Sequence, residues 1–212
     1  DHGSAAGLFS LWEECKKAEI KPILGNEFYV APESRLIHKR LDNHKMAYHL
    51  TVLAKNEEGL KNIFRMTSKS WQEGLFNGRP RIDNELLREY SNGLVVLSGC
   101  SSGQLSSFLM EERWEEAKTQ LLFLMDTFKN DFYIEVQNHG INWQPRLNTL
   151  LTSIAEKYSL PIVATQDSHY QEKENVLLHA NIVKLSMGDM QFETDQVWFK
   201  SREEMEEMFP NN

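Results

Sequence analysis

The sequence predicts a single α/β domain in which strands and helices alternate. Three observations support this fold class. Short apolar runs of strand length alternate with segments whose apolar residues recur at the helical period. The 212 residues are 41% hydrophobic and 25% charged, which is typical of one compact domain, and no low-complexity run or long linker divides them. Alternation favours a parallel sheet, open or closed into a barrel, with functional residues beyond the carboxyl ends of the strands.

The first third of the chain shows this alternation. In residues 4–18 the helical period is carried on one face by four residues: Leu8, Leu11, Trp12 and Cys15. Residues 21–32 are an apolar run bounded by prolines and predict a strand, whereas the polar residues 33–45 predict a loop. A second strand is expected over residues 48–56. The helix expected over residues 56–74 turns four side chains inward: Leu60, Ile63, Phe64 and Trp71.

The rest of the chain continues the pattern. Strands are expected over residues 92–100, 131–140 and 160–170, each an apolar run that ends in polar groups. Two helices between these strands are indicated by apolar residues at helical spacing: Trp114, Ala117, Leu121, Met125 and Phe128 in one, and Leu147, Leu150, Leu151, Ile154 and Tyr158 in the other. Residues 201–209 predict a short helix capped by Ser201, with a glutamate three residues later.

Charge and composition limit the function classes. The formal net charge of −8 repels a phosphate backbone, so nucleic-acid chemistry would need metal ions or another domain to hold phosphates. No apolar stretch approaches the length of a membrane span and no signal peptide is visible. The two cysteines, Cys15 and Cys100, are too few for a disulfide framework. We therefore expect a cytoplasmic protein without membrane partners.

The segment IVATQDSHY, residues 162–170, carries an apolar strand into Asp167 and His169. In extended backbone, residues two apart point to the same side with roughly 7 Å between their Cα atoms. An acid and an imidazole on one side of a strand end suit a metal ion, although a surface turn could also contain them.

Further metal-ligand types recur near strand ends: His2, Glu27, His49 and Cys100. His49 fits this pattern least, because it precedes its apolar run. Glu27 lies inside an apolar strand, where an unpaired carboxylate is costly and must meet a cation, a donor or water. Mixed imidazole, carboxylate and thiolate ligands suit zinc, manganese or iron, and more than four candidates indicate more than one ion.

Each candidate also has a purely structural interpretation. Cys100 alone is more often a small packed thiol, and Cys15 on an apolar helix face is a packing residue. His49 alone is more often a satisfied histidine at a strand start. The polar loop predicts that His38 and His44 are solvated, and we interpret His139, in a loop, and His179, in a helical stretch, as structural residues.

Seven segments together resemble one family: DHG, GNEFYVAP, YHLTVLAKNEEGLKN, GRPRID, GLVVLSGCSSGQL, FYIEVQNHG and LPIVATQDSHY. They are similar to the polymerase and histidinol phosphatase (PHP) domain, in the form found at the start of bacterial replicative DNA polymerase III alpha subunits. The resemblance covers almost the whole chain. It implies one PHP domain over residues 1–212 with a distorted, TIM-like (β/α)7 barrel. Because DHG stands at the very start, we expect the first barrel strands to be missing from this chain.

The resemblance also implies a metal site with up to three ions. Six of the family's nine ligands have counterparts here: His2, Glu27, His49, Cys100, Asp167 and His169. The other three lie before the chain begins. Zinc or manganese is expected, with iron or magnesium as alternatives. Glu27 would bridge ions and Asp167 would complete a coordination sphere, so both are assigned catalytic roles.

Three further residues are substrate candidates. Arg79 and Arg81 in GRPRID could bind phosphate bidentately, although a solvent-facing turn explains them equally well. Glu135 shares a strand face with Tyr133 and Gln137 and is placed near the substrate or behind the ligands.

The function that the resemblance implies is metal-dependent 3′–5′ exonuclease hydrolysis, hence proofreading, within a DNA polymerase. The implied partners are the primer 3′ end, the remaining polymerase domains and, through the whole protein, a sliding clamp and other replisome subunits. Two alternatives remain at this point. The metals could only stabilise the polymerase, or the domain could be a stand-alone phosphomonoesterase such as a histidinol phosphatase.

Overall fold

The computed structural model describes residues 2–187 and 194–209. Contacts divide the chain into two compact units, residues 1–134 and 135–212. Each unit has its own helices and its own candidate site residues. None of the described helices has the length and apolar character needed to cross a membrane.

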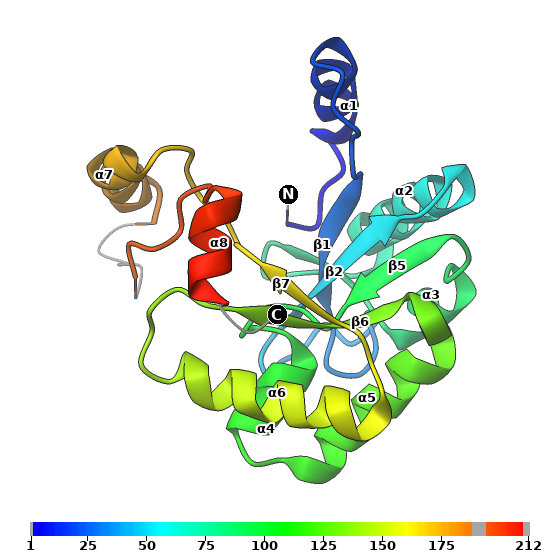
Figure 1. The fold of residues 1–212 in the computed structure, drawn as a ribbon. Helices are drawn as coiled ribbons and strands as arrows, with labels where there is room; N and C mark the ends of the chain where they lie inside the picture. The colour runs from blue at the N-terminus through cyan, green and yellow to red at the C-terminus, as the bar shows by residue number, and fades with distance from the viewer. Residues whose placement is uncertain (1, 188–193, 210–212) are drawn as a thin grey trace. The chain divides into compact units, whose positions relative to one another are not determined.

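The first unit contains a mixed sheet, in which β1, β2 and β5 lie side by side (Figure 1). Its strands follow the spatial order β3-β4-β1-β2-β5-β6 and are β1 (Gly25–Val30), β2 (Tyr48–Ala54), β3 (Leu75–Phe76), β4 (Arg79–Ile82), β5 (Leu94–Leu97) and the first residues of β6 (Phe132–Gln137). The β1–β2, β2–β5 and β3–β4 pairs are antiparallel, whereas β1–β4 and β5–β6 are parallel. The expected parallel sheet is therefore wrong, because alternation along the sequence locates strands without giving their direction.

The described helices of the first unit are α1 (Leu8–Lys17), α2 (Glu57–Glu73), α3 (Asn84–Glu89), α4 (Gln104–Met110) and α5 (Trp114–Phe128), followed by the 3₁₀ turn η1 (Lys129–Asp131). Helix α2 contacts β2 and β4, while α4 packs on α5. The sequence patterns missed α3, α4 and the β3–β4 hairpin. These elements are short, and α4 is buried from Gln104 to Leu109, so no polar face marks its period.

Helix α2 begins where its cap predicts, since the Asn56 side chain accepts a hydrogen bond from Gly59 N at 3.0 Å. Its buried stripe includes Ile63 as expected, but Phe64 and Trp71 are 44% and 50% exposed. The buried face of α2 is therefore rotated about the helix axis relative to the face that the spacing predicts. Gly59 allows α2 to lie against the backbone of Gly93. A Cβ at residue 59 would lie 1.8 Å from the carbonyl oxygen of Gly93, so only glycine permits this approach.

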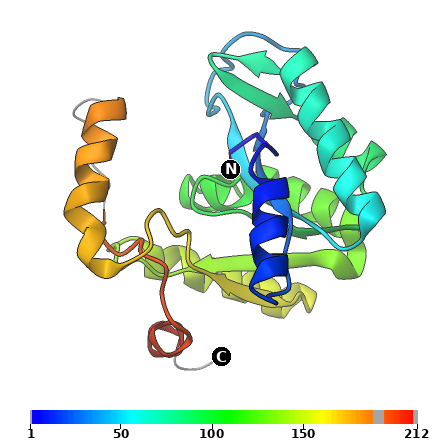
Figure 2. The ribbon, with the colours of Figure 1, turned by 90° about the horizontal axis from the view of Figure 1, so that it is seen from above.

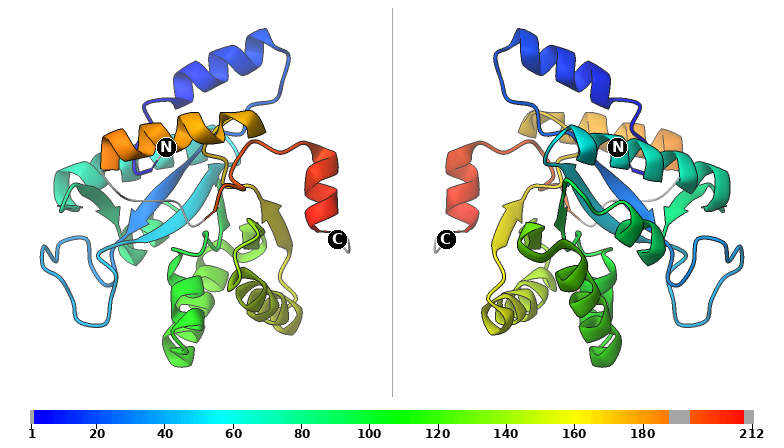
Figure 3. Two further views of the ribbon diagram at one scale, coloured as in Figure 1. Left: turned by 90° about the vertical axis from the view of Figure 1, so that its left-hand side faces the viewer. Right: turned by 90° about the vertical axis from the view of Figure 1, so that its right-hand side faces the viewer.

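Helix α1 starts at Leu8, four residues later than expected, and lies outside the body of the first unit (Figures 1 and 3). Only Leu8 of its predicted apolar face is buried; Leu11 and Trp12 are 45% and 40% exposed. Cys15 is partly exposed and is a free thiol.

Residues 33–45 form the expected loop, within the longer segment 31–47 that joins β1 to β2, and two arginines hold this loop in place. Arg35 is buried and donates to Asp83 Oδ2 at 3.0 Å and to Glu73 Oε2 at 2.7 Å. Asp83 is also buried, accepts from the backbone N of Arg35 and caps α3. Arg81 is 1% exposed and donates to carbonyl oxygens of the loop, including that of Ile37 at 2.9 Å.

The second unit contains the rest of β6, the helix α6 (Gln144–Tyr158), the strand β7 (Ile162–Thr165) beside β6, the turn η2 (Lys173–Asn175), and two further helices, α7 (Val176–Met187) and α8 (Arg202–Met208). Helices α7 and α8 do not lie side by side (Figure 2). The predicted cap of α8 is confirmed, because Ser201 and Glu204 form a capping box.

The mixed arrangement confirms the α/β class. Closure of a barrel and the absence of N-terminal strands are not established by the strands that the structure describes.

The buried ion pair between Arg35 and Asp83 gives the first prediction. Replacing Arg35 with Met leaves the buried Asp83 carboxylate without its guanidinium partner, so we expect the free energy of unfolding to fall by about 3 kcal/mol. Arg65→Met is the matched control, since the Arg65–Glu58 pair is half exposed and is expected to contribute less than about 1 kcal/mol. Urea unfolding measures both. Equal losses in the two variants would contradict the account.

Candidate metal centre

The antiparallel pairing of β1 with β2 brings Glu27 and His49 together. Tyr29 lies opposite His49 and Glu27 opposite Thr51, so these side chains share one face of the sheet. The His49 Nδ1 atom lies 2.7 Å from Glu27 Oε1. Because β2 runs against β1, the start of β2 lies beside the carboxyl end of β1. This explains why His49 precedes its apolar run.

His2 and Cys100 complete a four-residue cluster, which we call the Glu27 cluster: His2, Glu27, His49 and Cys100. His2 forms a β-bridge beside Glu27, and its Nδ1 lies 3.3 Å from Glu27 Oε2. Cys100 follows β5, with its Sγ 3.5 Å from His49 Nδ1 and 3.8 Å from Glu27 Oε1. Three residues that are distant in the sequence therefore meet around the Glu27 carboxylate.

The donor set of the Glu27 cluster fits a divalent metal ion. Ligand atoms of His2, Glu27 and His49 all lie within 4.8 Å of one another. Tetrahedral zinc with bonds of about 2.1 Å would hold its ligand atoms about 3.4 Å apart, so small shifts suffice. The two oxygens of Glu27 face different neighbours, Oε2 toward His2 and Oε1 toward His49 and Cys100. A carboxylate in this position can serve one ion or bridge two.

The surroundings favour the ionised form of Glu27. Burial raises the pKa of its carboxyl group, but the hydrogen bond from His49 and the positive charges of His49 and His2 outweigh burial, so the pKa lies below its usual value. Tyr29 packs against both imidazoles, with ring centroids 5.8 Å from His2 and 5.4 Å from His49. We missed Tyr29 in the sequence, although its position two residues after Glu27 on the same strand was the available signal.

Asp167 and His169 lie in the second unit, where they are brought together by a turn rather than by a strand. Strand β7 ends at Thr165, and Asp167 has a left-handed backbone with φ of 49°. The expected extended geometry is therefore wrong, but the side chains still approach, with 4.0 Å between His169 Nδ1 and Asp167 Oδ1. Nδ1 also lies 2.8 Å from the carbonyl oxygen of Asp167, to which it can only donate. This bond places the ring proton on Nδ1, so Nε2 is the nitrogen at which a metal ion would bind.

Glu135 lies on β6 and is buried, 4% exposed. Its Oε1 accepts hydrogen bonds from Thr165 Oγ1 at 2.5 Å and from Gln137 Nε2 at 3.2 Å. These bonds connect Glu135 to the end of β7, two residues before Asp167. The position suits a supporting role behind the turn.

The two arginines of GRPRID differ sharply. Arg81 is buried and its guanidinium donates to backbone carbonyl oxygens, which argues against contact with a substrate. Arg79 is partly exposed, and its guanidinium lies over the Tyr29 ring at 5.6 Å from the centroid. Among the residues that the structure describes, no carboxylate pairs with Arg79. Arg79 therefore lies beside the Glu27 cluster with its donors available.

The remaining histidines all have contacts. His38 Nε2 lies 2.8 Å from the carbonyl oxygen of Glu73, and His44 contacts the Tyr48 hydroxyl and Arg113, so neither is simply solvated. The His179 ring lies 5.9 Å from that of His169. His139 is buried and hydrogen-bonded.

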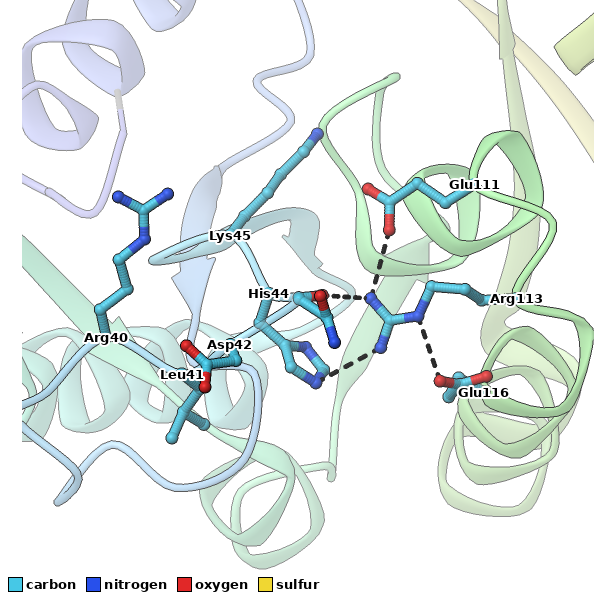
Figure 4. Close-up of a pocket in the computed structure, with 9 residues that line it drawn as sticks. Arg40, Leu41, Asp42, His44, Lys45, Glu111, Arg113 and Glu116 are labelled. Atoms are coloured by element: carbon cyan, nitrogen blue, oxygen red, sulfur yellow. Dashed lines mark hydrogen bonds and ion pairs between the residues drawn. The ribbon is translucent and has the colours of Figure 1, made fainter.

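A cavity of about 1100 Å³ opens elsewhere in the first unit (Figure 4). It is lined by nine residues of the loop and of the α4–α5 region: Arg40, Leu41, Asp42, Asn43, His44, Lys45, Glu111, Arg113 and Glu116. The Arg113 guanidinium donates hydrogen bonds to Glu111, to Glu116 and to a carbonyl oxygen of the loop. None of the lining residues belongs to the Glu27 cluster, and the acids and bases roughly balance. We therefore place the candidate site at the cluster and not in this cavity.

Known protein families and curated proteins include matches to this chain. A family model described as the PHP domain matches residues 1–139, which include the whole Glu27 cluster. The chain is 40% identical over 216 residues to DNA polymerase III subunit alpha of Borreliella burgdorferi, covering 99% of the chain and 19% of that protein. It is 38% identical over 218 residues to the Thermus aquaticus subunit, covering 99% and 18%, and 37% identical over 225 residues to that of Treponema pallidum, covering 100% and 19%. The chain spans about a fifth of the length of these relatives.

The second prediction tests the Glu27 cluster. Glu27→Gln removes the charge around which the other three residues gather, so we expect the affinity for zinc to fall at least 10-fold, the lower range for loss of a partner around a metal ligand. Glu57→Gln is the control, because it removes the same charge from the exposed surface of α2. Competition with a chelator measures both affinities. Unchanged zinc affinity in Glu27→Gln would contradict metal binding by this cluster.

Proposed function

The chain belongs to the PHP domain family, and on this premise we propose that it is a metal-dependent phosphodiesterase domain of a cytoplasmic replicative DNA polymerase. In this proposal the whole protein extends DNA and the domain removes nucleotides from the primer 3′ end. The remaining polymerase domains, a sliding clamp and other replisome subunits would be its partners. The observation that carries the proposal is the Glu27 cluster, in which three metal-ligand side chains lie around one ionised carboxylate.

Each unit, taken by itself, contains proposed ligands. His2, Glu27, His49 and Cys100 are proposed ligands in the first unit, and Asp167 and His169 in the second. The mixed donors favour zinc or manganese, with iron or magnesium as alternatives. Bound divalent ions would neutralise the phosphate and lower the pKa of a bound water toward neutrality.

The protein's own groups would perform the remaining tasks. Glu27 presents an oxygen on each side, which suits a bridging carboxylate, and the His169 tautomer presents Nε2. Arg79, beside the cluster on the Tyr29 ring, can bind a phosphate oxygen pair through its planar guanidinium. A net charge of −8 makes such cations necessary for contact with DNA. Arg81 has no part in this mechanism, because its donors hold the loop.

A structural role is the second candidate, and one observation favours it. His2, Glu27 and His49 have ligand atoms within 4.8 Å of one another, and Cys100 Sγ lies 3.5 Å from His49 Nδ1. A zinc ion that took all four residues as ligands would have no open site for water or substrate. In that case the metal would stabilise the polymerase, and another protein would edit its errors.

The third prediction separates these functions. In the full-length protein, Asp167→Asn is expected to lower excision of a mismatched primer end at least 100-fold, beyond the 10–100-fold loss typical of a residue that only supports a ligand. Primer extension should be unchanged. Asp126→Asn, on the exposed surface of α5, removes the same charge and should leave excision unchanged.

Two outcomes would contradict catalysis here. If purified Asp167→Asn excises at the normal rate, the activity lies elsewhere. If the unaltered protein shows no excision but loses thermal stability when metal is chelated, the structural role is correct. Faster hydrolysis of a small phosphomonoester than of single-stranded DNA would instead indicate a phosphatase.

A further inference from the structure

His139 is a buried titratable residue outside the proposed ligand set. It follows β6 in the second unit and is 4% exposed. Burial lowers the pKa of its imidazole, although the hydrogen bond to Gln166 acts in the opposite direction. A neutral, buried imidazole needs partners for both ring nitrogens, and these partners show what the residue does.

The Gln144 side chain fixes the tautomer of His139. Its Oε1 accepts a hydrogen bond from the backbone N of His139 at 2.7 Å, so its Nε2 is the atom that faces His139 Nδ1 at 3.0 Å. The amide nitrogen can only donate, so Nδ1 is the acceptor and carries no proton. The proton is therefore on Nε2, which donates to the carbonyl oxygen of Gln166 at 2.8 Å. His139 is thus a donor aimed at the peptide group between Gln166 and Asp167.

Gln166 is held from a second side as well. Its side-chain Nε2 donates to the carbonyl oxygen of Lys200 at 2.8 Å, and its Oε1 accepts from the backbone N of Lys200 at 2.8 Å. The next residue, Asp167, has the left-handed φ of 49°, which is unfavourable for a residue with a Cβ. The hydrogen bonds on both sides of Gln166 stabilise this strained backbone.

The same backbone sets the ligand geometry of the turn. The left-handed residue directs its carbonyl oxygen to His169 Nδ1 at 2.8 Å, and the backbone N of His169 donates to the carbonyl oxygen of Val197 at 2.7 Å. If the peptide before Asp167 rotates, both the Asp167 side chain and the His169 tautomer lose their fixed positions. A ligand pair of this kind binds tightly only when its supporting bonds hold it in place.

We propose that His139 is a positioning residue, which holds the turn 166–169 so that Asp167 and His169 are presented together as metal ligands. The inference rests on the proposed function, since it assumes that both residues bind metal. It assigns His139 no contact with substrate. Its action passes through one hydrogen bond, to the carbonyl oxygen of Gln166.

The fourth prediction compares three variants of the full-length protein. His139→Leu removes the donor, and we expect zinc affinity to fall about 10-fold or more. His139→Gln keeps an N–H at a similar reach and should restore most of the affinity. Leu151→Ala, a truncation in the buried face of α6, should lower the melting temperature and leave zinc affinity unchanged. Chelator competition and thermal unfolding measure the two quantities on each variant.

Three results would overturn the inference. One is normal zinc affinity in His139→Leu. Another is a loss of affinity that follows the melting temperature equally in His139→Leu and Leu151→Ala, since that is a general effect of stability. Asp167→Asn identifies which claim fails: normal zinc affinity in Asp167→Asn overturns the ligand assignment and this inference with it. A loss in Asp167→Asn without one in His139→Leu overturns the inference alone.

Discussion

The antiparallel pairing of β1 with β2 is the constraint on which the candidate site depends. It places Glu27 and His49 on one sheet face, and the bridges of His2 and the turn after β5 bring the other two donors to the same carboxylate. A partly buried carboxylate surrounded by two imidazoles and a thiol is stable only if positive charge compensates it. The hydrogen bond from His49 stabilises the carboxylate in part, and a metal ion would supply the compensating charge.

At Asp167 the positions of the candidate ligands are set by a turn and not by the pairing of strands. Its ligand geometry comes from a left-handed residue, a neighbouring carbonyl oxygen and a buried histidine that carries its proton on a defined nitrogen. Backbone strain at such positions is common where function needs a side chain in a fixed place. The residue before Asp167, Gln166, is hydrogen-bonded on one side to His139 and on the other to Lys200, so hydrogen bonds hold the turn outside any strand.

The sequence predicts the positions of most strands and one helix cap, but not the direction of the strands or the contacts made with backbone groups. Apolar runs located β1, β2, β5, β6 and β7, and the cap of α8 was predicted to the residue. Strand direction was not predictable, because it depends on pairing between distant segments, and so the position of His49 looked anomalous. The spacing in α2 predicts Phe64 and Trp71 on the inward face, but both are exposed, because spacing gives the period of an apolar face and not the edge of it that meets the sheet. The role of Arg81 depends on carbonyl groups, which no side-chain pattern reveals.

The most direct test of the account is the position of the metal ions. A crystal structure of the full-length protein grown with zinc, with anomalous scattering recorded at the zinc edge, should show an ion about 2.0–2.3 Å from Glu27 and from donor atoms of His49 and Cys100. Anomalous peaks that avoid Glu27, or a Glu27 cluster that holds only hydrogen bonds at saturating zinc, would contradict the claim that this carboxylate organises a metal centre.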